Sequence, residues 1–403
     1  MDGASHQVLS DLEFSLHGTS VPCSAHVLPS IAAVDRNGWD RLFGSACRGF
    51  DYFRACELSD QSDFKLFAVA LFAGGRLIAG VPAFETTIPL NILLEGTARK
   101  IAAAAGQWFP RAMSVPIVGL GSPYWEEVAL VFDTDLDADA RRRATTLILD
   151  ALDRYAKKNG IGTLIAKNIS DTERNLLDAS FQKGGYAPIE ALPLTSLVVP
   201  RTDEAYIQSL SPNMRSNMRR KLKKAKGLRM EIRTNVNGIE DDLHRMRTAT
   251  TSRAKIDFEA FSQVPRGYYR AVLEQMGGKA YLRLFWLDEQ LIGFALVLRG
   301  PREVTETYTG MLYPEGPDHG LFFFNWMIHL KEARQLGMNE IDSGPTTYIT
   351  KQRLNCQFHR SWIFVRDRKR LLNWILHSFA DTIGFNKSDP DLKLLGNRAP
   401  YVN

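Results

Sequence analysis

The sequence of 403 residues has little cysteine, and its cysteines are not grouped. Cys23, Cys47, Cys56 and Cys356 form no CxxC pair, and no histidine accompanies them at the spacing of a zinc site. We therefore expect neither a disulfide scaffold nor a bound metal. A reducing compartment fits this composition.

Long apolar runs are also missing. No window approaches the roughly 20 apolar residues that a spanning helix needs. The start, MDGASHQVLSDLEF, lacks the basic stretch and apolar run of a secretory signal. We therefore expect a cytoplasmic protein with no transmembrane segment. With 45% apolar and 24% charged residues, the chain has ordinary globular composition and enough length for two domains.

Positive charge is concentrated in one segment. The stretch SPNMRSNMRRKLKKAKG, residues 211–227, holds seven basic residues and no acidic one, although the net charge of the whole chain is only +5. Ser211 suits an N-cap, Pro212 the first helical position and Gly227 a left-handed stop, which together predict a helix of about four turns. Its narrow apolar stripe consists of Met214, Met218, Leu222 and Ala225.

Two interpretations of this basic helix stay open at this point. Its cations are a solvated helix surface, or they bind an anionic partner such as a phosphate, a tRNA backbone or an acidic polymer. The repulsion among seven like charges favours the anionic partner. Residues 211–229 contain no aromatic side chain, so the segment does not predict recognition of bases by stacking.

Two segments share one pattern. Residues 65–87 and 279–298 each read as a β-hairpin, and each is followed at a distance by a long helix that ends at glycine and then by a short strand. We interpret this repeat as an internal duplication, with chance similarity of two α/β segments as the alternative. The first copy is longer, and we place the extra residues around LNILLEGTARKIAAAAGQWFPRAMS.

The domain boundary is expected near residues 200–204, after the apolar strand LTSLVVP and before the basic helix. We predict one domain over residues 1–200, a second over 201–366, and a closing amphipathic helix with a surface tail over 367–403. The second domain, which begins with the basic helix, is the expected location of the active site.

The basic helix, the hairpin after it and the stretch over 308–355 resemble the GNAT-like acyltransferases grouped with the Fem-type peptidyltransferases and the CelD-like acetyltransferases. The residues that carry the resemblance are Ser211, Arg215, Arg219, Arg220, Tyr308, Gly320, Gly337, Asp342, Gly344 and Lys351. The resemblance implies an α/β (α+β) fold of two tandem GNAT-like domains, each a mixed, mostly antiparallel central sheet flanked by helices. It also implies transfer of an acyl group to an amine or hydroxyl.

The donor loop departs from the family pattern. Coenzyme-A enzymes of this kind carry an Arg/Gln-x-x-Gly-x-Gly/Ala loop whose N–H groups hold the pyrophosphate at a helix N-terminus. The corresponding YPEGPDHGLFF contains Glu315 and Asp318 but neither Arg nor Gln. Donor or anion binding is assigned to the basic helix and to this loop, through Arg215, Arg219, Arg220, Lys223, Gly316, Gly320 and Leu321.

Catalytic candidates lie where the two central strands of a GNAT domain diverge, close to residues 305–313 and 341–346. Glu306 and Tyr308 are predicted to share one face of their strand, as residues two apart do. The full set of candidates is Asp342, Lys351, Tyr308, Glu306 and His319.

Each candidate also has a possible structural role without any part in catalysis. Asp342 is a base or amine anchor, or else an Asx-type turn or N-cap. Lys351 holds a phosphate or a developing oxyanion, or only flanks a short helix. Tyr308 is a proton donor or a core tyrosine, Glu306 a catalytic or a paired surface carboxylate, and His319 a general base or an exposed loop residue.

The sequence thus predicts an N-acyltransferase that moves an acyl group from an acyl-CoA, such as acetyl-CoA, to an amine of a small molecule or of a cell-envelope or polysaccharide precursor. One alternative is a Fem-type peptidyltransferase that uses aminoacyl-tRNA. Another is a non-catalytic module that binds nucleic acid or a polyanion through its basic helix.

Overall fold

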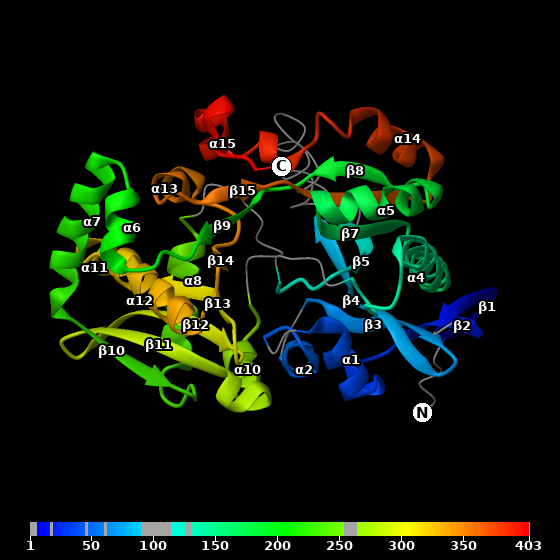
Figure 1. Cartoon of the computed structure of the whole chain (residues 1–403), viewed down its shortest axis with the longest axis horizontal. Helices are drawn as coiled ribbons and strands as arrows, with labels where there is room; N and C mark the ends of the chain where they lie inside the picture. The colour runs from blue at the N-terminus through cyan, green and yellow to red at the C-terminus, as the bar shows by residue number, and fades with distance from the viewer. Residues whose placement is uncertain are drawn as a thin grey trace. The chain divides into compact units, whose positions relative to one another are not determined.

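The computed structural model describes residues 6–16, 19–44, 47–59, 63–89, 114–125, 130–253 and 264–402, which form two compact units (Figure 1). The first unit combines residues 1–44, 62–192 and 360–388, and the second combines residues 45–61, 193–359 and 389–403. Each unit is thus assembled from segments that are far apart in the sequence. Both contain a mostly antiparallel sheet with helices, as expected for a mixed α/β fold.

The first unit is organised around one mixed sheet. In sheet order its strands are β1 (His6–Leu16), β2 (Thr19–Leu28), β3 (Lys65–Ala73), β4 (Arg76–Pro89), β5 (Ser114–Leu120), β7 (Thr163–Ser170), β16 (Ser361–Asp367) and β8 (Ala187–Glu190), while β6 (Val131–Phe132) pairs with β4. β5 and β7 pair in parallel and the other neighbours are antiparallel. The hairpin predicted over 65–87 is confirmed as β3 and β4.

Two helices, α4 (Ala138–Lys158) and α5 (Asp171–Lys183), pack on the sheet of the first unit. α4 begins at the N-cap Asp137, whose carboxylate accepts from the Ala140 N–H, and it contributes a row of buried aliphatic residues to the core of the sheet. α5 begins with a reciprocal capping box between Ser170 and Glu173. α1 (Arg36–Phe43) lies earlier in the chain, and α14 (Arg370–Phe379) follows β16.

The second unit contains two separate sheets. The first has the order β10 (Leu228–Arg233), β11 (Ala280–Leu287), β12 (Gln290–Arg299) and β13 (Val304–Met311), and the second has the order β14 (Glu340–Asp342), β9 (Leu194–Val198) and β15 (Gln357–His359). α12 (Leu321–Gln335) packs on both sheets, because its Leu330 and Ala333 share one core cluster with Val297 of β12 and Ile341 of β14. The strands of this unit therefore separate into two sheets between β13 and β14, and α12 packs against both.

The remaining helices of this unit surround the sheets. They are α2 (Phe50–Leu58), α6 (Asp203–Ser209), α7 (Pro212–Lys224), α8 (Glu240–Thr251), α10 (Tyr268–Met276), α11 (Glu315–Asp318), α13 (Tyr348–Arg353) and α15 (Pro390–Leu395). α8 packs on β12 and β13, on the face opposite α12: a Cβ at Gly310 would meet Phe294 of β12 and the α8 backbone. α2 packs against α10.

The basic helix forms as α7, and its start is as predicted. The Ser211 hydroxyl accepts from the Met214 N–H, and Pro212 is the first helical residue. Met214, Met218 and Ala225 are buried and Leu222 packs beside them, so the apolar stripe is confirmed. The predicted left-handed stop at Gly227 is wrong, because the chain leaves α7 through a 3-10 turn over Ala225–Gly227 with no positive φ at this glycine.

The order of elements repeats in the two units. Hairpin, strand, helix and strand appear as β3, β4, β5, α4 and β7 in the first unit and as β11, β12, β13, α12 and β14 in the second. This repeat supports the duplication that the sequence suggested. The extra residues placed around 90–114 lie almost entirely outside the described residues.

Two strands differ from the expected domain boundaries. β9, the apolar strand expected to end the first domain, pairs with β14 and β15 in the second unit. β16, expected in the second domain, pairs with β7 and β8 in the first unit. The two occupy equivalent places, each inserted between a strand and the next strand of its sheet, where their backbone groups find hydrogen-bond partners on both sides. The expected 1–200, 201–366 and 367–403 division therefore differs from the observed units.

Candidate active site

A β-bulge in β13 decides where two of the candidates point. Tyr308 pairs with Leu296, but Glu306 pairs with Val297, so Thr307 is the extra residue of β13. Leu296 and Val297 are adjacent and point to opposite faces, so Glu306 and Tyr308 do as well. The prediction that they share one face is wrong, because alternation does not continue through a bulge.

Glu306 belongs to a buried ionic network on the α12 side. The Arg283 guanidinium, which is fully buried, donates to Glu306 Oε2 at 3.0 Å and to Glu332 Oε2 at 2.6 Å. Asn325 donates to the same Glu306 oxygen at 2.7 Å. Burial raises the pKa of Glu306, although Arg283 and Asn325 act in the opposite direction. These contacts make Glu306 a packing and charge-compensating residue.

His329 is buried beside the same guanidinium. Its Nδ1 lies 3.5 Å from Arg283 Nη2, and its burial, with the Arg283 charge, lowers its pKa to about 3. The imidazole is therefore neutral at physiological pH. These contacts give His329 a structural role in the core of the domain.

Tyr308 points to the opposite face of β13, among aromatic residues. Its ring meets the Tyr268 ring edge-on at 5.4 Å between centroids, and the Arg247 guanidinium lies 4.8 Å from its centroid on α8. The Tyr268 hydroxyl is 3.0 Å from the Tyr52 hydroxyl of α2. Burial raises the pKa of Tyr268 and of Tyr52 well above the ordinary value, so both phenols stay neutral.

Asp342 lies on one face of the three-stranded sheet with Ser196, Glu340 and His359. Asp342 pairs with Ser196, which in turn pairs with Gln357 of β15, so the three form a row across the sheet. The Ser196 hydroxyl is 2.6 Å from His359 Nε2, and Glu340 Oε1 is 3.9 Å from the same nitrogen. We call these four residues the Asp342 face. Ile341, the intervening residue of β14, points instead into the core with α12.

Asp342 is an exposed residue at the end of β14. Desolvation by the surrounding protein raises its pKa, while the charges of Arg48 and His359 lower it. Asp342 ends a strand, and the N-cap position of α13 is taken by Thr347, so the interpretation of Asp342 as a helix cap is wrong.

The loop after Asp342 adopts an unusual backbone. Thr346 and Thr347 have φ values of 71° and 52°, which side chains other than glycine rarely adopt. Buried Lys351 holds the loop, since its Nζ donates to the carbonyls of Ser343, Gly344 and Pro345 at 2.5, 2.7 and 2.9 Å. These contacts assign Lys351 to the loop carbonyls, in place of the phosphate or oxyanion that the sequence suggested. Backbone strain of this kind persists where the surroundings hold it, often beside functional sites.

The backbone N–H groups of the loop expected to bind the donor form hydrogen bonds within the loop itself. Those of Gly316, Asp318, His319 and Gly320 all donate to carbonyls between residues 312 and 317. A Cβ at Gly320 would come within 2.5 Å of the Lys221 carbonyl oxygen, so this glycine is needed for the approach of α7. Gly316 is likewise required by contact with Met311. Both glycines are explained by packing.

His319 is held in the same loop. Its Nδ1 lies 2.9 Å from the Glu315 carbonyl oxygen, and its backbone N–H donates to that oxygen. Leu321, the first residue of α12, is buried. The loop N–H groups are thus engaged, and the first turn of α12 is the place nearby that suits an anion. The first N–H groups of a helix have no hydrogen-bond partner within that helix.

The cations of α7 divide into two groups. Arg215 donates to the Gln208 and Leu210 carbonyls, and Arg219 forms an ion pair with Glu204 at 3.2 Å. These two residues serve the local structure. Lys221 donates to the Pro317 carbonyl at 2.7 Å, and burial together with Arg220 and Lys224 lowers its pKa. The second half of α7 therefore brings positive charge to the start of α12, and Lys223 is exposed there.

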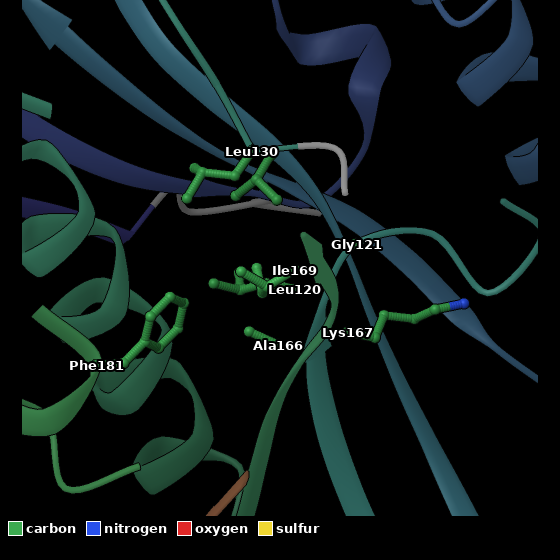
Figure 2. A pocket seen from close by; sticks show the side chains of 8 residues that line it. Leu120, Gly121, Leu130, Ala166, Lys167, Ile169 and Phe181 are labelled. Atoms are coloured by element: carbon green, nitrogen blue, oxygen red, sulfur yellow. The ribbon is translucent and has the colours of Figure 1, made fainter. Parts of the chain in front are cut away.

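A small apolar cavity lies in the first unit, where β5 and β7 diverge. Figure 2 shows Leu120, Ala166 and Phe181 around it, with the Lys167 side chain pointing away. The Lys167 ammonium donates to the carbonyls of Ser122 and Trp125. The cavity, about 10 Å³, accommodates about one water molecule. It is too small for an acyl donor.

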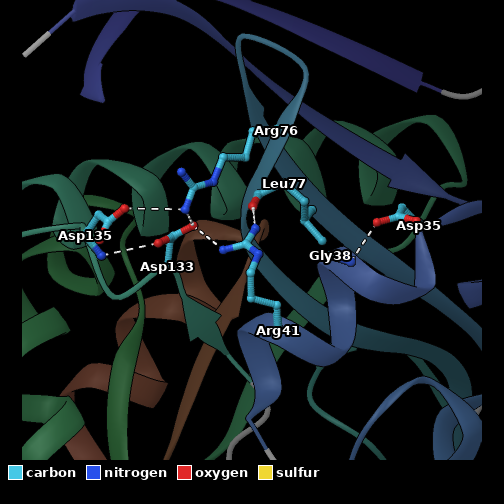
Figure 3. A network of polar contacts seen from close by, with 7 residues as sticks. All are labelled: Asp35, Gly38, Arg41, Arg76, Leu77, Asp133 and Asp135. Atoms are coloured by element: carbon cyan, nitrogen blue, oxygen red, sulfur yellow. Dashed lines mark hydrogen bonds and ion pairs between the residues drawn. The ribbon is translucent and has the colours of Figure 1, made fainter. Parts of the chain in front are cut away.

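The first unit also contains an ionic cluster around Asp133 (Figure 3). This buried carboxylate accepts from Arg41 at 2.5 Å and from Arg76 at 2.7 Å, and Arg41 also donates to the Leu77 carbonyl. Burial alone would raise the pKa of Asp133, but the hydrogen bond and charge of Arg41, with Arg76, hold it below its usual value. The cluster ties α1, β4 and the segment after β6 together.

The structure therefore brings some predicted residues together and separates others. Asp342 and Lys351 meet at one loop, whereas Glu306 and His319 are engaged elsewhere. Sequence reasoning missed Ser196 and His359, because the pairing of β9 with β14 and β15 was not foreseen. It also missed Arg283, whose position inside an apolar strand was the available signal, since a buried arginine requires paired carboxylates.

In the part of the chain that the structure describes, no group of three or more His, Cys, Asp or Glu side chains is arranged to hold a metal ion. None of the described helices has the length and hydropathy needed to traverse a bilayer. The four cysteines are buried, and none of them takes part in a disulfide.

Comparison with known proteins identifies part of the chain. Residues 212–352 match the family described as the acetyltransferase (GNAT) domain. No curated protein matches the sequence significantly. A crystal structure of FemX superposes with a TM-score of 0.56 at 11% identity, over 85% of this chain and 98% of that one. A tandem GNAT protein from the clavulanic acid biosynthesis pathway gives a TM-score of 0.49 at 13% identity, over 85% and 98% of the two chains. At these identities the similarity to FemX concerns the fold.

Proposed function

Because residues 212–352 form a GNAT acetyltransferase domain, the chain is an acyltransferase, and we propose that it transfers an acyl group from an acyl-CoA to an amine bound at the Asp342 face. Such a transfer forms an amide C–N bond, breaks the thioester C–S bond and passes one amine proton to a base while coenzyme A leaves as the thiol. The observation that carries this proposal is the exposed Asp342 at the end of β14, where the sheet of β13 and the sheet of β14 separate.

Asp342 suits two tasks in this reaction. Its carboxylate attracts an ammonium group, and its raised pKa brings it closer to the range in which a carboxylate accepts a proton at neutral pH. Lys351 acts as a positioning residue, because it fixes the loop that follows Asp342 through three carbonyls. The Ser196 and His359 pair, 2.6 Å apart on the same face, offers a route for the proton to solvent.

The start of α12 suits the donor's phosphates. Its first turn offers N–H groups, and Arg220 and Lys224 of α7 add positive charge close to it, while Asp318 acts in the opposite direction. The loop N–H groups at Gly316 and Gly320 are already used. We therefore assign phosphate binding to the helix start and α7, and not to the glycines.

A donor titration tests the first half of the proposal. Purified protein is mixed with acetyl-CoA, longer acyl-CoAs and free coenzyme A, and its thermal midpoint is recorded. Binding to the folded state raises the midpoint as ligand is added. Arg220→Glu with Lys224→Glu should abolish the response, while the distant Arg299→Glu should keep it. No shift with any of these ligands would exclude the acyl-CoA donor.

A substitution series tests the second half. Thiol release from the effective acyl-CoA is followed with a panel of primary amines. Loss of a general base typically lowers the rate about 10²-fold or more. Asp342→Asn should show that loss at an unchanged thermal midpoint, and Ser196→Ala should show a smaller one. The control Glu289→Gln, at an exposed acid in the turn between β11 and β12, should retain turnover. Full activity of Asp342→Asn would contradict the assignment.

The exposed cations of α7 support a second candidate, transfer from an aminoacyl-tRNA. Lys223 and Lys224 of α7 are exposed, and so is Lys226 in the 3-10 turn that follows. Phosphate contacts make such binding fall steeply with salt. Co-purification of RNA at low salt, lost at high salt and in Lys223→Glu with Lys226→Glu, is expected of this candidate. Protein free of nucleic acid at low salt would count against it.

A further inference from the structure

The closing helix α14 turns its apolar side to solvent. Five large side chains are exposed, at 68%, 43%, 61%, 38% and 48% of their surface: Leu371, Leu372, Trp374, Ile375 and Phe379. They lie within about 160° of the helix circumference at 100° per residue. The sequence predicts an amphipathic helix here, and in the usual arrangement this stripe would be buried.

The polar side of α14 holds the helix to the first unit. Asn373 donates to the Gly185 carbonyl at 3.2 Å and accepts from the Asp367 N–H at 3.0 Å. His377 Nε2 also lies 3.2 Å from the Gly185 carbonyl oxygen. The helix is thus anchored by hydrogen bonds on one side while its apolar side is free. An orientation fixed in this way is specific, since rotation of the helix would bury the stripe and break these bonds.

Basic residues lie at the start of the helix. Lys369 and Arg370 are exposed at its N-terminus, where the helix dipole disfavours positive charge. Two carboxylates in this region are already engaged: Asp153 pairs with Arg366 at 3.0 Å and Arg368 at 2.9 Å, and Asp367 accepts from the Thr163 hydroxyl and the Lys369 backbone N–H. The Arg368 N–H donates to the Gly162 carbonyl, which joins this end of α14 to the turn after α4, whose last residues include the exposed Lys157 and Lys158.

We propose that α14 docks the protein on a membrane surface that carries anionic lipid headgroups. Leucine, tryptophan and phenylalanine on one side, with lysine and arginine beside them, are the features of a helix that lies in the interface of a bilayer. The cations complement the negative surface, and each exposed Lys or Arg adds to the attraction. The five apolar side chains enter the boundary between headgroups and acyl chains.

A second copy of the chain fits this surface less well. α14 has ten residues and is about 15 Å long. Contact between two such helices falls short of the roughly 1,200 Å² that a stable protein interface buries, and the basic residues of the two copies would repel. The proposal is independent of the acyl donor and acceptor.

Co-sedimentation of the full chain with vesicles tests it. Vesicles of phosphatidylcholine alone and of phosphatidylcholine with phosphatidylglycerol are compared at low and high salt. We expect retention on the anionic vesicles, weakened by salt. Leu371→Glu with Trp374→Glu should reduce the partition coefficient about tenfold or more, and so should Lys369→Glu with Arg370→Glu. Wild-type protein that stays in the supernatant would overturn the proposal.

Controls separate docking from folding and from self-association. Leu394→Glu, at a residue 64% exposed on α15, should bind vesicles like the wild type. The α14 variants should keep the wild-type circular dichroism and thermal midpoint, because their side chains are exposed. Sedimentation velocity without lipid should show no dimer that depends on Trp374. A dimer lost in Trp374→Glu, or equal vesicle binding by that variant, would overturn the proposal in favour of a protein partner or of no docking.

Discussion

Glu306 and Tyr308 lie on opposite faces of β13, because Thr307 is bulged between them. Glu306 contacts Arg283 and Asn325 on the α12 side, and Tyr308 contacts Tyr268 and Arg247 on the α8 and α10 side. One extra residue thus separates the ionic core of the domain from its aromatic face. A substitution at Glu306 should therefore affect the ionic network, and one at Tyr308 the aromatic cluster.

Removal of Arg283 should destabilise the second unit strongly. Arg283→Leu leaves Glu306 and Glu332 facing each other without their shared cation, and loss of one partner of a buried pair costs about 3 kcal/mol or more. Urea denaturation measures the change in the free energy of unfolding. Arg299→Leu, at an exposed arginine of the next strand, should cost little. A loss below about 1 kcal/mol for Arg283→Leu would show that Glu306 and Glu332 do not need the charge of Arg283.

His329 predicts a specific pH dependence. Its pKa is about 3 in the folded protein against 6.5 for the free side chain, so below pH 6.5 the unfolded chain binds a proton that the folded chain does not. Stability should therefore be complete above pH 6.5 and fall as the pH drops, by about 2 kcal/mol at pH 5. His329→Gln should remove this dependence, and His377→Gln should not. Parallel pH profiles for wild type and His329→Gln would refute the neutral, buried imidazole.

Lys351 should matter for the loop after Asp342. Lys351→Met removes three hydrogen bonds to the carbonyls of Ser343, Gly344 and Pro345, and buried bonds from a charged donor are worth roughly 2 kcal/mol in total after desolvation is counted. Chemical denaturation should show this loss, and Lys331→Met, at an exposed lysine, should be near neutral. Equal effects of the two substitutions would mean that the loop does not need its lysine.

Asp133 should stabilise the first unit only above acidic pH. Its carboxyl has a lowered pKa in the folded state, so its contribution is present above the ordinary value near 3.8 and is lost as the pH falls through the folded value. Asp133→Asn should cost about 1 to 2 kcal/mol at pH 7, a figure reduced because Arg41 and Arg76 are partly exposed. Asp135→Asn, at a more exposed carboxylate, is the matched control. A cost that persists unchanged at pH 2 would contradict the ionic origin.

The pairing of β9 in the second unit predicts which fragments of the chain keep the sheet of β14 and β15. A fragment over 201–403 lacks β9, so β14 and β15 lose the strand that joins them. A fragment over 193–403 keeps it. We expect the longer fragment to resist limited proteolysis around residues 340–359 better than the shorter one. Identical cleavage of both would show that β9 is not needed for this sheet.

Local patterns predicted much of the fold. The two hairpins, the helices α4, α7 and α12 and the N-cap at Ser211 follow from turn residues, periodicity and capping, which depend on residues close in sequence. The duplication could be predicted for the same reason. The sequence did not show that β9 joins the second unit and β16 the first, because strand pairing across long sequence distances leaves no local signal.

The candidate site was predictable only in part. Asp342 and Lys351 were found from a resemblance and do meet at one loop. Ser196 and His359 join them through strand pairing that no short motif encodes. The error at Glu306 has the same origin, since a bulge depends on the partner strand and not on the sequence of β13 alone.

The reciprocal placement of β9 and β16 has a consequence for synthesis on the ribosome. β7 and β8 of the first unit are complete by residue 190, but β16, which lies between them, is translated only from residue 361 on. Until then their facing edges have unpaired backbone groups, which are prone to pair with other chains. The nascent protein therefore completes both sheets only after residues 357–367 have been made, and chaperone protection of these edges should raise the yield of native protein.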